Sequence, residues 1–585
     1  MKNVFERGLA SALTGLLSSC DSAPEWSVAE VLALLEQPPD ASLGDYAFPC
    51  FQLARFFRKA PPNIAAELAE QWTHSGVSAH GVEQVQATGP YLNFTISPGA
   101  LADAILPALA SGESFSAAQT ETRERVMIEF SQPNTHKGFH VGHLRNVALG
   151  DALCRIFRYN GYEVIGANYI GDVGTHIAKC LWYYESFNQE SPPEQQRGAW
   201  LGELYTKATL LLEDAPAELR ETYQQEVRKI LQKLEGDDPK LIAIWEETRQ
   251  WSLDDFAEIY EWLGVHFDHI FFESEVDDEG RKMVLQGEQD GVFQFSDGAI
   301  GMDLEEEQLG FFLLLKSDGT TLYSTKDLAL AKRKFEQFGI DRSIYVVGAE
   351  QTLHFKQVFA TLRSMGYAQA ELCHHLPYAL VMLPEGKMSS RAGNVILFSQ
   401  LRQKILDSLR TQHFQARKGE WPDEEIEETS RKVAVAALKY GMLAQDPAKQ
   451  IVFSMEDWLK TEGDTGTYLV YAYVRICSIV RQLGIKPSAA ADCSLLCHPN
   501  EKALSRRLLD FNRVVWSAGE QFKPSLLAHA LYGLARDFSR AYTTCSVKHA
   551  ETESLQHARL LLFHGVAETL KQGLHLLGIT PPERL

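Results

Sequence analysis

The sequence predicts a multidomain α/β protein. It indicates a small α+β domain at the N-terminus, a doubly wound parallel sheet with a helical insertion, and an all-α bundle at the C-terminus. The 585 residues exceed what one core can hold and suggest roughly three or four domains. A strand, a polar turn and a helix follow one another at residues 125–157, as in a nucleotide-binding unit. Beyond residue 433, apolar side chains recur at three- and four-residue spacing, which indicates packed helices.

Composition favours a soluble globular protein, with 45% apolar and 23% charged residues. No apolar run reaches the roughly 18 residues of a membrane span, and the N-terminus lacks the apolar core of a signal peptide. We therefore expect a cytoplasmic protein. Nine cysteines without a CxxC pair are typical of free thiols. Cys493, Cys497 and His498 come closest to a metal cluster but lack a fourth ligand, so we expect no tightly bound metal.

Charge is unevenly distributed along the chain. The formal net charge of −21 argues against nonspecific coating of nucleic acid. Residues 433–585 contain 17 Lys and Arg against 14 Asp and Glu, a balance of +3, which leaves −24 for residues 1–432. A bound polyanion is therefore expected to contact mainly the C-terminal third.

The first 112 residues form a separate small domain in this interpretation. Amphipathic helices are predicted at residues 4–17, 28–35 and 62–72, and a strand-like segment at 82–96 is broken by Gly89 and Pro90. Residues 111–124 are rich in Ser, Thr, Gln and Glu and indicate a linker. Nothing in this domain has catalytic spacing, so we expect it to contact a partner.

An anion site is predicted where the first buried strand, residues 125–130, turns into its helix. His140 and His143 lie at the helix start, three residues apart and on one face. Free backbone N–H groups and the positive end of the helix dipole attract an anion there. Gly142 lets a ligand approach the backbone closely. The alternative is that both histidines are helix caps or surface residues, and the tetrapeptide alone leaves this open.

Further strands and one long helical segment complete the predicted sheet domain. A second strand at residues 162–170 ends in a glycine-rich turn, and a charge-rich helical insertion follows at about 178–262. Strand patterns resume at residues 270–274, at 311–316 before an Asp318-Gly319 turn, at 343–348 and at 378–383. Lys387 follows in a loop of small residues, from which a cation can close over phosphates. The alternative is a solvated surface lysine.

Helices are predicted at residues 433–442, 466–483, 504–516, 523–542 and 555–577. Two of them mix aromatic residues with arginines, as a base-stacking surface does: Tyr468, Tyr471, Tyr473 and Arg475 on one, and Arg536, Arg540 and Tyr542 on the other. The alternative is that these tyrosines fill the core of the bundle.

Two short motifs, in this order, carry a family resemblance. His140-Val-Gly-His143, followed about 240 residues later by Lys387-Met-Ser-Ser390, resembles the two signatures of class I aminoacyl-tRNA synthetases. Longer runs are similar to arginyl-tRNA synthetases, namely residues 129–145, 171–175, 323–327 and 463–475, together with 44–47 and the C-terminal 576–585. The resemblance therefore spans almost the whole chain.

The resemblance implies a division into four parts. These are an N-terminal α+β tRNA-contacting domain at 1–112, a class I Rossmann-like catalytic domain with its helical insertion at 120–400, a connecting helical segment at 401–455, and an all-α anticodon-binding domain at 456–585. Gly463 to Thr467 and the terminal Leu585 depart from the family pattern, which makes tRNA contacts less secure than the adenylate site.

The implied function is ATP-dependent activation of L-arginine to arginyl-adenylate, followed by transfer to tRNA(Arg). ATP is expected with Mg²⁺, bound tRNA is expected to be needed for activation, and a monomer that binds neither DNA nor membrane is expected. His140, His143 and Lys387 are implied as the catalytic residues that stabilise charge on the α-phosphate. Gly142, Met388, Ser389 and Ser390 would bind ATP beside them.

The implied arginine pocket uses two acids. Asp327 and Glu273 are expected to bind the guanidinium, with Tyr323 as a wall, because a planar cation favours bidentate carboxylates. Asn134, Gln351 and Glu129 are expected to orient the α-amino and carboxylate groups. The alternative for Glu273 is an exposed carboxylate at a strand end.

Two rival functions remain open from the sequence. Another class I synthetase, such as a cysteinyl or glutamyl enzyme, shares the signatures but does not need two acids facing a cation. A catalytically inactive RNA-binding paralogue would have lost signature residues, whereas His140, His143 and Lys387 are all present.

Overall fold

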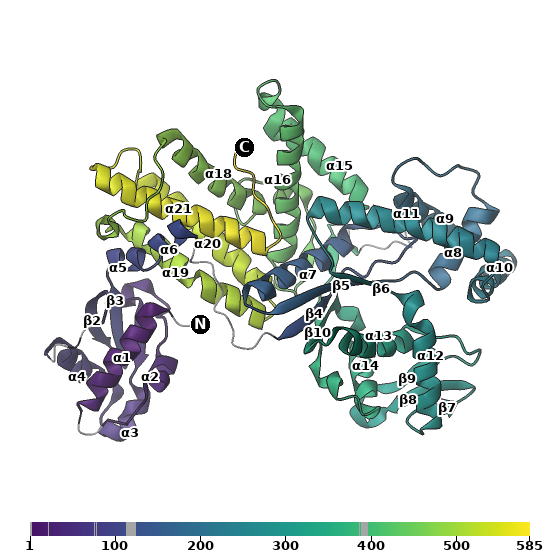
Figure 1. The fold of residues 1–585 in the computed structure, drawn as a ribbon, viewed down its shortest axis with the longest axis horizontal. Coiled ribbons are helices and arrows are strands. Elements are labelled where there is room, and N and C mark those ends of the chain that lie inside the picture. The colour runs from purple at the N-terminus through teal and green to yellow at the C-terminus, as the bar shows by residue number, and fades with distance from the viewer. Residues whose placement is uncertain are drawn as a thin grey trace.

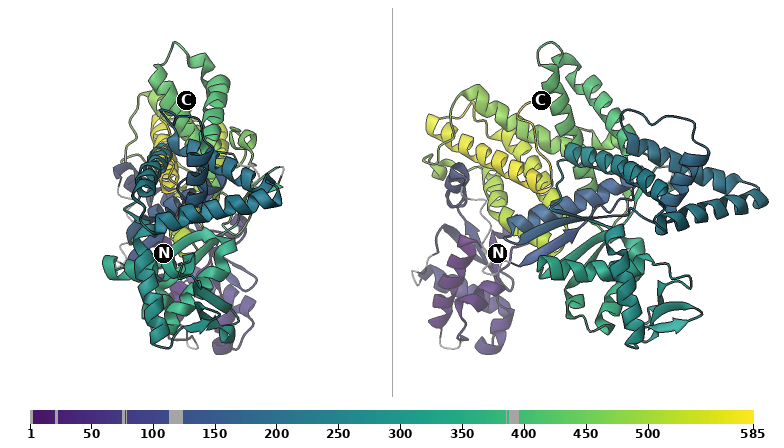
Figure 2. Two further views of the ribbon diagram at one scale, coloured as in Figure 1. Left: turned by 90° about the vertical axis from the view of Figure 1, so that its right-hand side faces the viewer. Right: turned by 45° about the vertical axis from the view of Figure 1, so that its right-hand side comes forward.

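The computed structural model describes residues 3–20, 23–74, 77, 79–112, 124–384, 386–387 and 396–585. The N-terminal domain lies beside the C-terminal helices, and the insertion helices α8–α11 extend from the opposite side of the central sheet (Figure 1). Seen after a 90° turn, these parts overlap in a narrow column, so the molecule is flattened (Figure 2). Among the described residues, no helix is long and apolar enough to cross a membrane.

The N-terminal domain packs four helices around an antiparallel sheet with strand order β1-β3-β2. Its elements are α1 (Val4–Ser18), α2 (Val28–Leu34), β1 (Tyr46–Pro49), α3 (Ala54–Phe57), α4 (Pro61–His74), β2 (Val82–Thr88) and β3 (Tyr91–Ile96). Gly89, at the turn between β2 and β3, has a φ of 56°, which favours glycine. The predicted break at Gly89 and Pro90 is thus the turn of a hairpin.

The N-terminal domain is fixed to the C-terminal bundle by charge and by two short helices. Lys502 Nζ lies 2.9 Å from Asp45 Oδ2, and the Arg506 guanidinium lies 4.3 Å from the centre of the Tyr46 ring. The helices α5 (Pro98–Asp103) and α6 (Leu106–Ser111) pack against α19 (Pro499–Glu520) and α21 (Glu553–Leu576). Leu106 and Leu109 accordingly belong to the large core of the remaining chain.

The central sheet is wholly parallel, with strand order β11-β10-β4-β5-β6. Its strands and principal helices are β4 (Arg125–Glu129), α7 (Val141–Tyr159), β5 (Glu163–Ile170), β6 (His269–Phe272), β10 (Arg342–Gly348), α14 (Thr352–Ser364) and β11 (Cys373–Tyr378). The first strand, β4, is central. The chain builds β5 and β6 on one side of it, then returns to place β10 and β11 on the other. Ligands bind at such a change of direction, outside the carboxyl ends of the strands.

Two insertions interrupt this sheet. The first lies between β5 and β6 and consists of α8 (Thr175–Ser186), α9 (Arg197–Asp214), α10 (Ala217–Glu235) and α11 (Pro239–Leu263). The second consists of α12 (Glu273–Gln289), β7 (Gln294–Ser296), β8 (Ala299–Leu304), β9 (Gly310–Leu315) and α13 (Tyr323–Phe338). The strand predicted at 311–316 is therefore present as β9, but it pairs in a separate antiparallel sheet. Gly319 has a φ of 78°, as its predicted turn requires.

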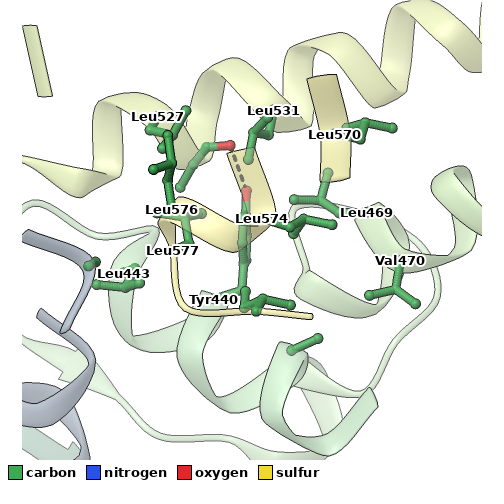
Figure 3. Packing of buried hydrophobic residues seen from close by; sticks show 14 of the residues in the cluster. Tyr440, Leu443, Leu469, Val470, Leu527, Leu531, Leu570, Leu574, Leu576 and Leu577 are labelled. Atoms are coloured by element: carbon green, nitrogen blue, oxygen red, sulfur yellow. Dashed lines mark hydrogen bonds between the residues drawn. The ribbon is translucent and has the colours of Figure 1, made fainter. Parts of the chain in front are cut away.

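The remaining chain is almost entirely helical. It contains β12 (Val381–Leu383), β13 (Gly386–Lys387), α15 (Phe398–Leu409), α16 (Asp423–Leu443), β14 (Ile451–Val452), α17 (Met455–Trp458), α18 (Gly466–Leu483), α20 (Pro524–Thr544), and α19 and α21. Leucines from α18, α20 and α21 converge on Tyr440 of α16 (Figure 3). The Tyr440 hydroxyl lies 2.5 Å from Asp464 Oδ1 and 3.1 Å from the Ala528 carbonyl oxygen, and the second of these contacts is drawn in Figure 3, so the one polar group of this buried side chain has partners.

A buried ion pair joins α7 of the sheet domain to α16. Lys439 Nζ lies 2.7 Å from Asp151 Oδ2, and Arg155 Nε lies 2.9 Å from Asp151 Oδ1. Burial alone would raise the pKa of Asp151, but Lys439 and Arg155 lower it below its ordinary value. A Cβ at Gly578 would collide with both partners of the pair, so the chain after α21 closes over it.

We predict that Asp151→Asn destabilises the protein. It leaves the Lys439 ammonium buried without its counter-charge, which costs about 3–5 kcal/mol of the free energy of unfolding. Urea denaturation followed by tryptophan fluorescence measures this. The matched double variant Asp151→Leu/Lys439→Met removes both charges and should recover most of the loss. An unchanged midpoint for Asp151→Asn would contradict the prediction.

Candidate active site

The predicted site residues come together at the carboxyl edge of the central sheet. Glu129 ends β4, Gly171 follows β5, Glu273 follows β6, and Gln351 ends the short 3-10 turn after β10. Because the strands are parallel, all four segments leave the sheet at the same edge. The start of α7, with its two histidines, faces the same edge because it follows β4 directly.

The two histidines cap their own helix. Gly142 N–H donates to His140 Nδ1 at 3.1 Å, and His140 N–H donates to His143 Nδ1 at 3.1 Å. The imidazole rings stack with centroids 3.9 Å apart. Two of the backbone N–H groups that a helix start leaves free are thereby satisfied by side chains.

Capping also fixes the protonation of both rings. Burial lowers the pKa of His140 to about 4 and, together with the nearby charges of His140 and Lys137, lowers that of His143 well below its ordinary value. Both imidazoles are therefore neutral near pH 7, and their Nδ1 atoms act as acceptors. The single ring proton lies on Nε2, so each histidine presents an N–H donor. The cap that the sequence offered as an alternative is therefore present, and because it uses only Nδ1 it is compatible with the predicted anion contact through Nε2, which stays a prediction.

The chain that follows the second signature, residues 387–390, bonds to the backbone on both sides of His140. The backbone of Lys387 pairs with Met382 in β13–β12, whereas Met388, Ser389 and Ser390 lie outside the described residues. On the far side, Val141 N–H donates to Ile396 O at 3.1 Å, and Phe398 N–H donates to Phe139 O at 2.9 Å. The chain that follows this loop is thus bonded to both sides of His140.

Two carboxylates and their partners line the neighbouring part of the edge. Glu273 Oε2 lies 3.3 Å from Lys326 Nζ, and Asp327 Oδ2 lies 2.6 Å from His354 Nε2. Glu273 is 5% exposed, which excludes the alternative of an exposed strand-end carboxylate. Tyr323 and Asp327 lie one helical turn apart at the start of α13, as predicted.

The carboxyl group of Glu273 keeps its proton up to a higher pH than an ordinary glutamate does. Burial raises its pKa to about 7 against the opposing effect of Lys326, and the charge of Asp327 raises it further. Tyr323 is 56% exposed, and partial desolvation together with the charges of Glu273 and Asp327 raises its pKa to about 12. The negative charges of Glu273 and Asp327 therefore act on each other and on Tyr323, and a bound cation would reduce this repulsion.

Gly171 allows Asn134 to reach this pocket. Asn134 pairs with Gly171 in an isolated parallel bridge, and a Cβ at Gly171 would collide with Asn134 Oδ1. The same Cβ would lie 3.2 Å from Glu273 Oε1. Asn134 and Glu273 thus meet over a backbone position that has room only for glycine.

Glu129 and Gln351 differ in their contacts with the rest of the chain. Glu129 Oε2 lies 2.5 Å from Lys334 Nζ, and its Oε1 accepts a bond from Gln132 Nε2 at 3.0 Å. Gln351 is exposed. Their predicted contacts with the amino acid stay predictions, and Glu129 would act from within a buried ion pair.

Sequence reasoning did not identify several partners of these residues. Lys326 lies inside a run that resembles the family, and its place directly before Asp327 was a usable signal. His354 and Lys334 carry no comparable signal, because only folding brings α14 and the end of α13 to Asp327 and Glu129. Asp172 is also completely buried and lies 2.8 Å from Arg249 Nε, which ties α11 to the sheet edge.

The predicted base-stacking residues divide into two groups. Tyr471 and Tyr542 are each 42% exposed, and the Arg475 guanidinium lies 4.8 Å and 5.1 Å from their ring centres. Tyr473 is buried in the core, and the Tyr468 hydroxyl bonds Ser539 Oγ at 3.0 Å within the bundle. Tyr468 and Tyr473 therefore belong to the bundle interior, as the alternative stated, whereas base stacking by Tyr471 and Tyr542 stays a prediction.

Comparison with known families and proteins is consistent along the whole chain. Residues 104–455 match the model of the catalytic domain of class I (R) tRNA synthetases, and residues 469–585 match the DALR anticodon binding domain. Residues 4–96 match the arginyl tRNA synthetase N terminal domain. The chain belongs to the arginyl-tRNA synthetase family.

Individual relatives of this family agree in length as well as in sequence. The arginine–tRNA ligase of Bdellovibrio bacteriovorus is 43% identical over 96% of each chain, and that of Clostridium perfringens is 35% identical over 94% of this chain and 96% of its own. The solved arginyl-tRNA synthetase of Thermus thermophilus is similar over 99% of this chain and 100% of its own, with a TM-score of 0.79 and 28% identity. The predicted fold class and family are confirmed.

We predict that His143→Ala lowers the rate of arginine-dependent adenylate formation about 10²- to 10³-fold, because it removes one fixed N–H donor. His143→Asn is the matched control, since its side-chain oxygen can replace the Nδ1 acceptor of the cap but supplies no donor at the Nε2 position. It should keep the melting temperature near that of the wild type and still lose the rate. Near-normal charging by His143→Ala would refute the assignment.

We predict that arginine binds more tightly as the pH rises from 6 to 8. The pKa of Glu273 is raised, so below pH 7 its carboxyl is protonated in the free protein, and above pH 7 it is ionised and attracts the guanidinium. The dissociation constant should fall about tenfold over this range. Calorimetry in buffers of different ionisation heat should detect proton release at pH 6. Glu273→Gln should bind weakly and without this slope, and a flat profile for the wild type would contradict the prediction.

Proposed function

We propose that this protein activates L-arginine with ATP to form arginyl-adenylate and transfers the arginyl group to tRNA(Arg). The observation that carries the proposal is that the capped histidine pair and two carboxylates, buried Glu273 and half-buried Asp327, flank the same sheet edge. The first suits a nucleotide phosphate, and the second suits the cationic end of one amino acid.

In the activation step, the arginine carboxylate attacks the α-phosphorus of ATP, and diphosphate leaves. Negative charge grows on the phosphoryl oxygens during this displacement. The Nε2–H groups of His140 and His143 are the proposed donors to those oxygens, each worth about 2–4 kcal/mol of barrier by comparison with single oxyanion donors. Lys387, supported by its sequence position, would add a cation from the second signature, with Gly142 and Met388 to Ser390 contacting ATP. ATP enters as its Mg²⁺ complex in this proposal.

Selectivity for arginine follows from the acid pocket. Glu273 and Asp327 would bind the guanidinium, Tyr323 would wall it, and Asn134 would direct the amino acid backbone over Gly171. A lysine ammonium cannot match two carboxylates in a planar arrangement, and a neutral isostere offers neither acid the charge-assisted bonds that a guanidinium donates. We expect rejection at binding, without a separate editing site.

Charging assays with the purified protein, ATP, tRNA(Arg) and each amino acid test this function. Incorporation of arginine alone supports it. Incorporation of another amino acid would indicate a different class I synthetase, and binding of tRNA without incorporation would indicate an inactive paralogue.

The exposed cluster of Arg475, Tyr471 and Tyr542 is the part of the bundle that we expect to contact RNA. A monomer in the cytoplasm is part of the same proposal.

We predict that activation of arginine needs bound tRNA. Arginine-dependent exchange of diphosphate into ATP should fall to the background rate when tRNA(Arg) is omitted, and should return when it is added back. The control is tRNA(Arg) with an oxidised 3′ end, which cannot accept arginine but should restore exchange. Full-rate exchange without any tRNA would refute the dependence.

A further inference from the structure

One buried arginine on the histidine helix has a set of partners that the proposed chemistry does not use. Arg145 lies two residues after His143 on α7 and is 1% exposed. Its NH1 donates to Met442 O at 3.0 Å. Its NH2 lies 3.1 Å from each of three further carbonyl oxygens, those of Asp446, Pro447 and Lys449.

The hydrogen bonds of this cation to the described residues are all to peptide carbonyls, whose dipoles stabilise its charge. In the part of the chain that the structure describes, no carboxylate forms an ion pair with Arg145, and all four acceptors are backbone carbonyls. Met442 O belongs to the last turn of α16, where the negative end of the helix dipole lies. A planar guanidinium suits several carbonyls at fixed angles, whereas an ammonium group offers its donors from one point.

The segment that Arg145 grips, residues 442–453, is bonded in turn to the strands that lead into the second signature. Ala379 N–H donates to Pro447 O at 2.8 Å, and Phe453 N–H donates to Met382 O at 2.8 Å. Within the segment, β14 pairs in parallel with β12, and β12 pairs with β13, which contains the backbone of Lys387. From His143 to Lys387 there is thus a continuous path of short bonds through Arg145.

The C-terminal bundle is attached to the same segment. Lys523, which precedes α20, places Nζ 2.8 Å from Asp446 Oδ2. Asp446 also offers its carbonyl to Arg145, so one residue contacts both the bundle and α7. The segment 442–453 therefore adjoins three parts of the molecule: the first signature, the second signature and the tRNA-binding bundle.

We propose that Arg145 is a positioning residue for ATP, which sets the spacing between the histidine end of α7 and the β12–β13 pair that carries Lys387. The inference rests on the proposed function. Groups on two separate elements must address one triphosphate, and a displacement of about 1 Å between such groups can cost about 10²-fold in rate. No substrate atom needs to touch Arg145 for this role.

The test compares Arg145→Lys with Arg155→Lys. Arg155 lies on the same helix and also donates to a carbonyl, that of Gly264 at 2.9 Å, while its ion pair is with Asp151. Among the described residues, none of its hydrogen bonds or ion pairs reaches residues 442–453. In exchange assays with tRNA present, Arg145→Lys should lower kcat/KM for ATP about 10- to 100-fold and leave KM for arginine within about twofold. Arg155→Lys should leave both KM values within about twofold, whatever its effect on the melting temperature.

Hydrogen exchange measured by mass spectrometry gives a second readout that needs no activity. Peptides that contain the amides of Ala379, Ile451 and Phe453 should exchange faster in Arg145→Lys and unchanged in Arg155→Lys, because those amides bond across the gripped segment. If the wild type fails to charge arginine, the proposed function fails, and this readout still decides whether Arg145 holds the segment 442–453 in place. Unchanged exchange, or KM values for ATP and arginine raised by equal factors, would overturn the inference.

Discussion

The rest of the site depends on one local constraint, the way in which α7 begins. A helix that starts at a sheet edge leaves backbone donors free, and those donors must be satisfied or offered to a ligand. Here the helix uses the Nδ1 atom of each histidine for its own cap, which leaves Nε2 of each ring outside the cap bonds. In the proposed function, these two Nε2–H groups bind the phosphate, and neither role needs a charged imidazole.

The elements around this start hold it from three directions. The chain after the second signature bonds to Phe139 and Val141, Arg145 grips the end of α16, and Asp151 pairs with Lys439 further along the helix. α7 is thus the common partner of the sheet, the second-signature strands and the C-terminal helices. In an arginine–tRNA ligase, the active site and the anticodon-binding domain lie in different parts of the chain. The helix α7 contacts both parts and therefore connects them physically.

The sequence allowed the prediction of most of this fold because its patterns are local. The helix from Val141 and its end near Gly161 follow from apolar spacing and a left-handed stop, and the bundle follows from the same spacing. The partner of β9 did not follow, since an apolar run of six residues does not reveal which sheet it joins. Pocket acids could be named by resemblance, but the shifted pKa of Glu273 depends on Lys326, Asp327 and burial, which arise only in the folded chain. The hydrogen bonds of Arg145 could not be predicted from the sequence either, because their acceptors are carbonyl groups about 300 residues away in the chain.

The capped histidines have a consequence for where protons can go. Each Nδ1 lone pair is already used by a backbone N–H, and each Nε2 already carries its hydrogen. Neither ring has a vacant lone pair, so neither can accept a proton from a substrate. These two rings therefore do not deprotonate the arginine carboxyl group. When the tRNA hydroxyl attacks the adenylate, its proton has to pass to another group, and the phosphate oxygens of the leaving AMP are bases that the reaction itself brings.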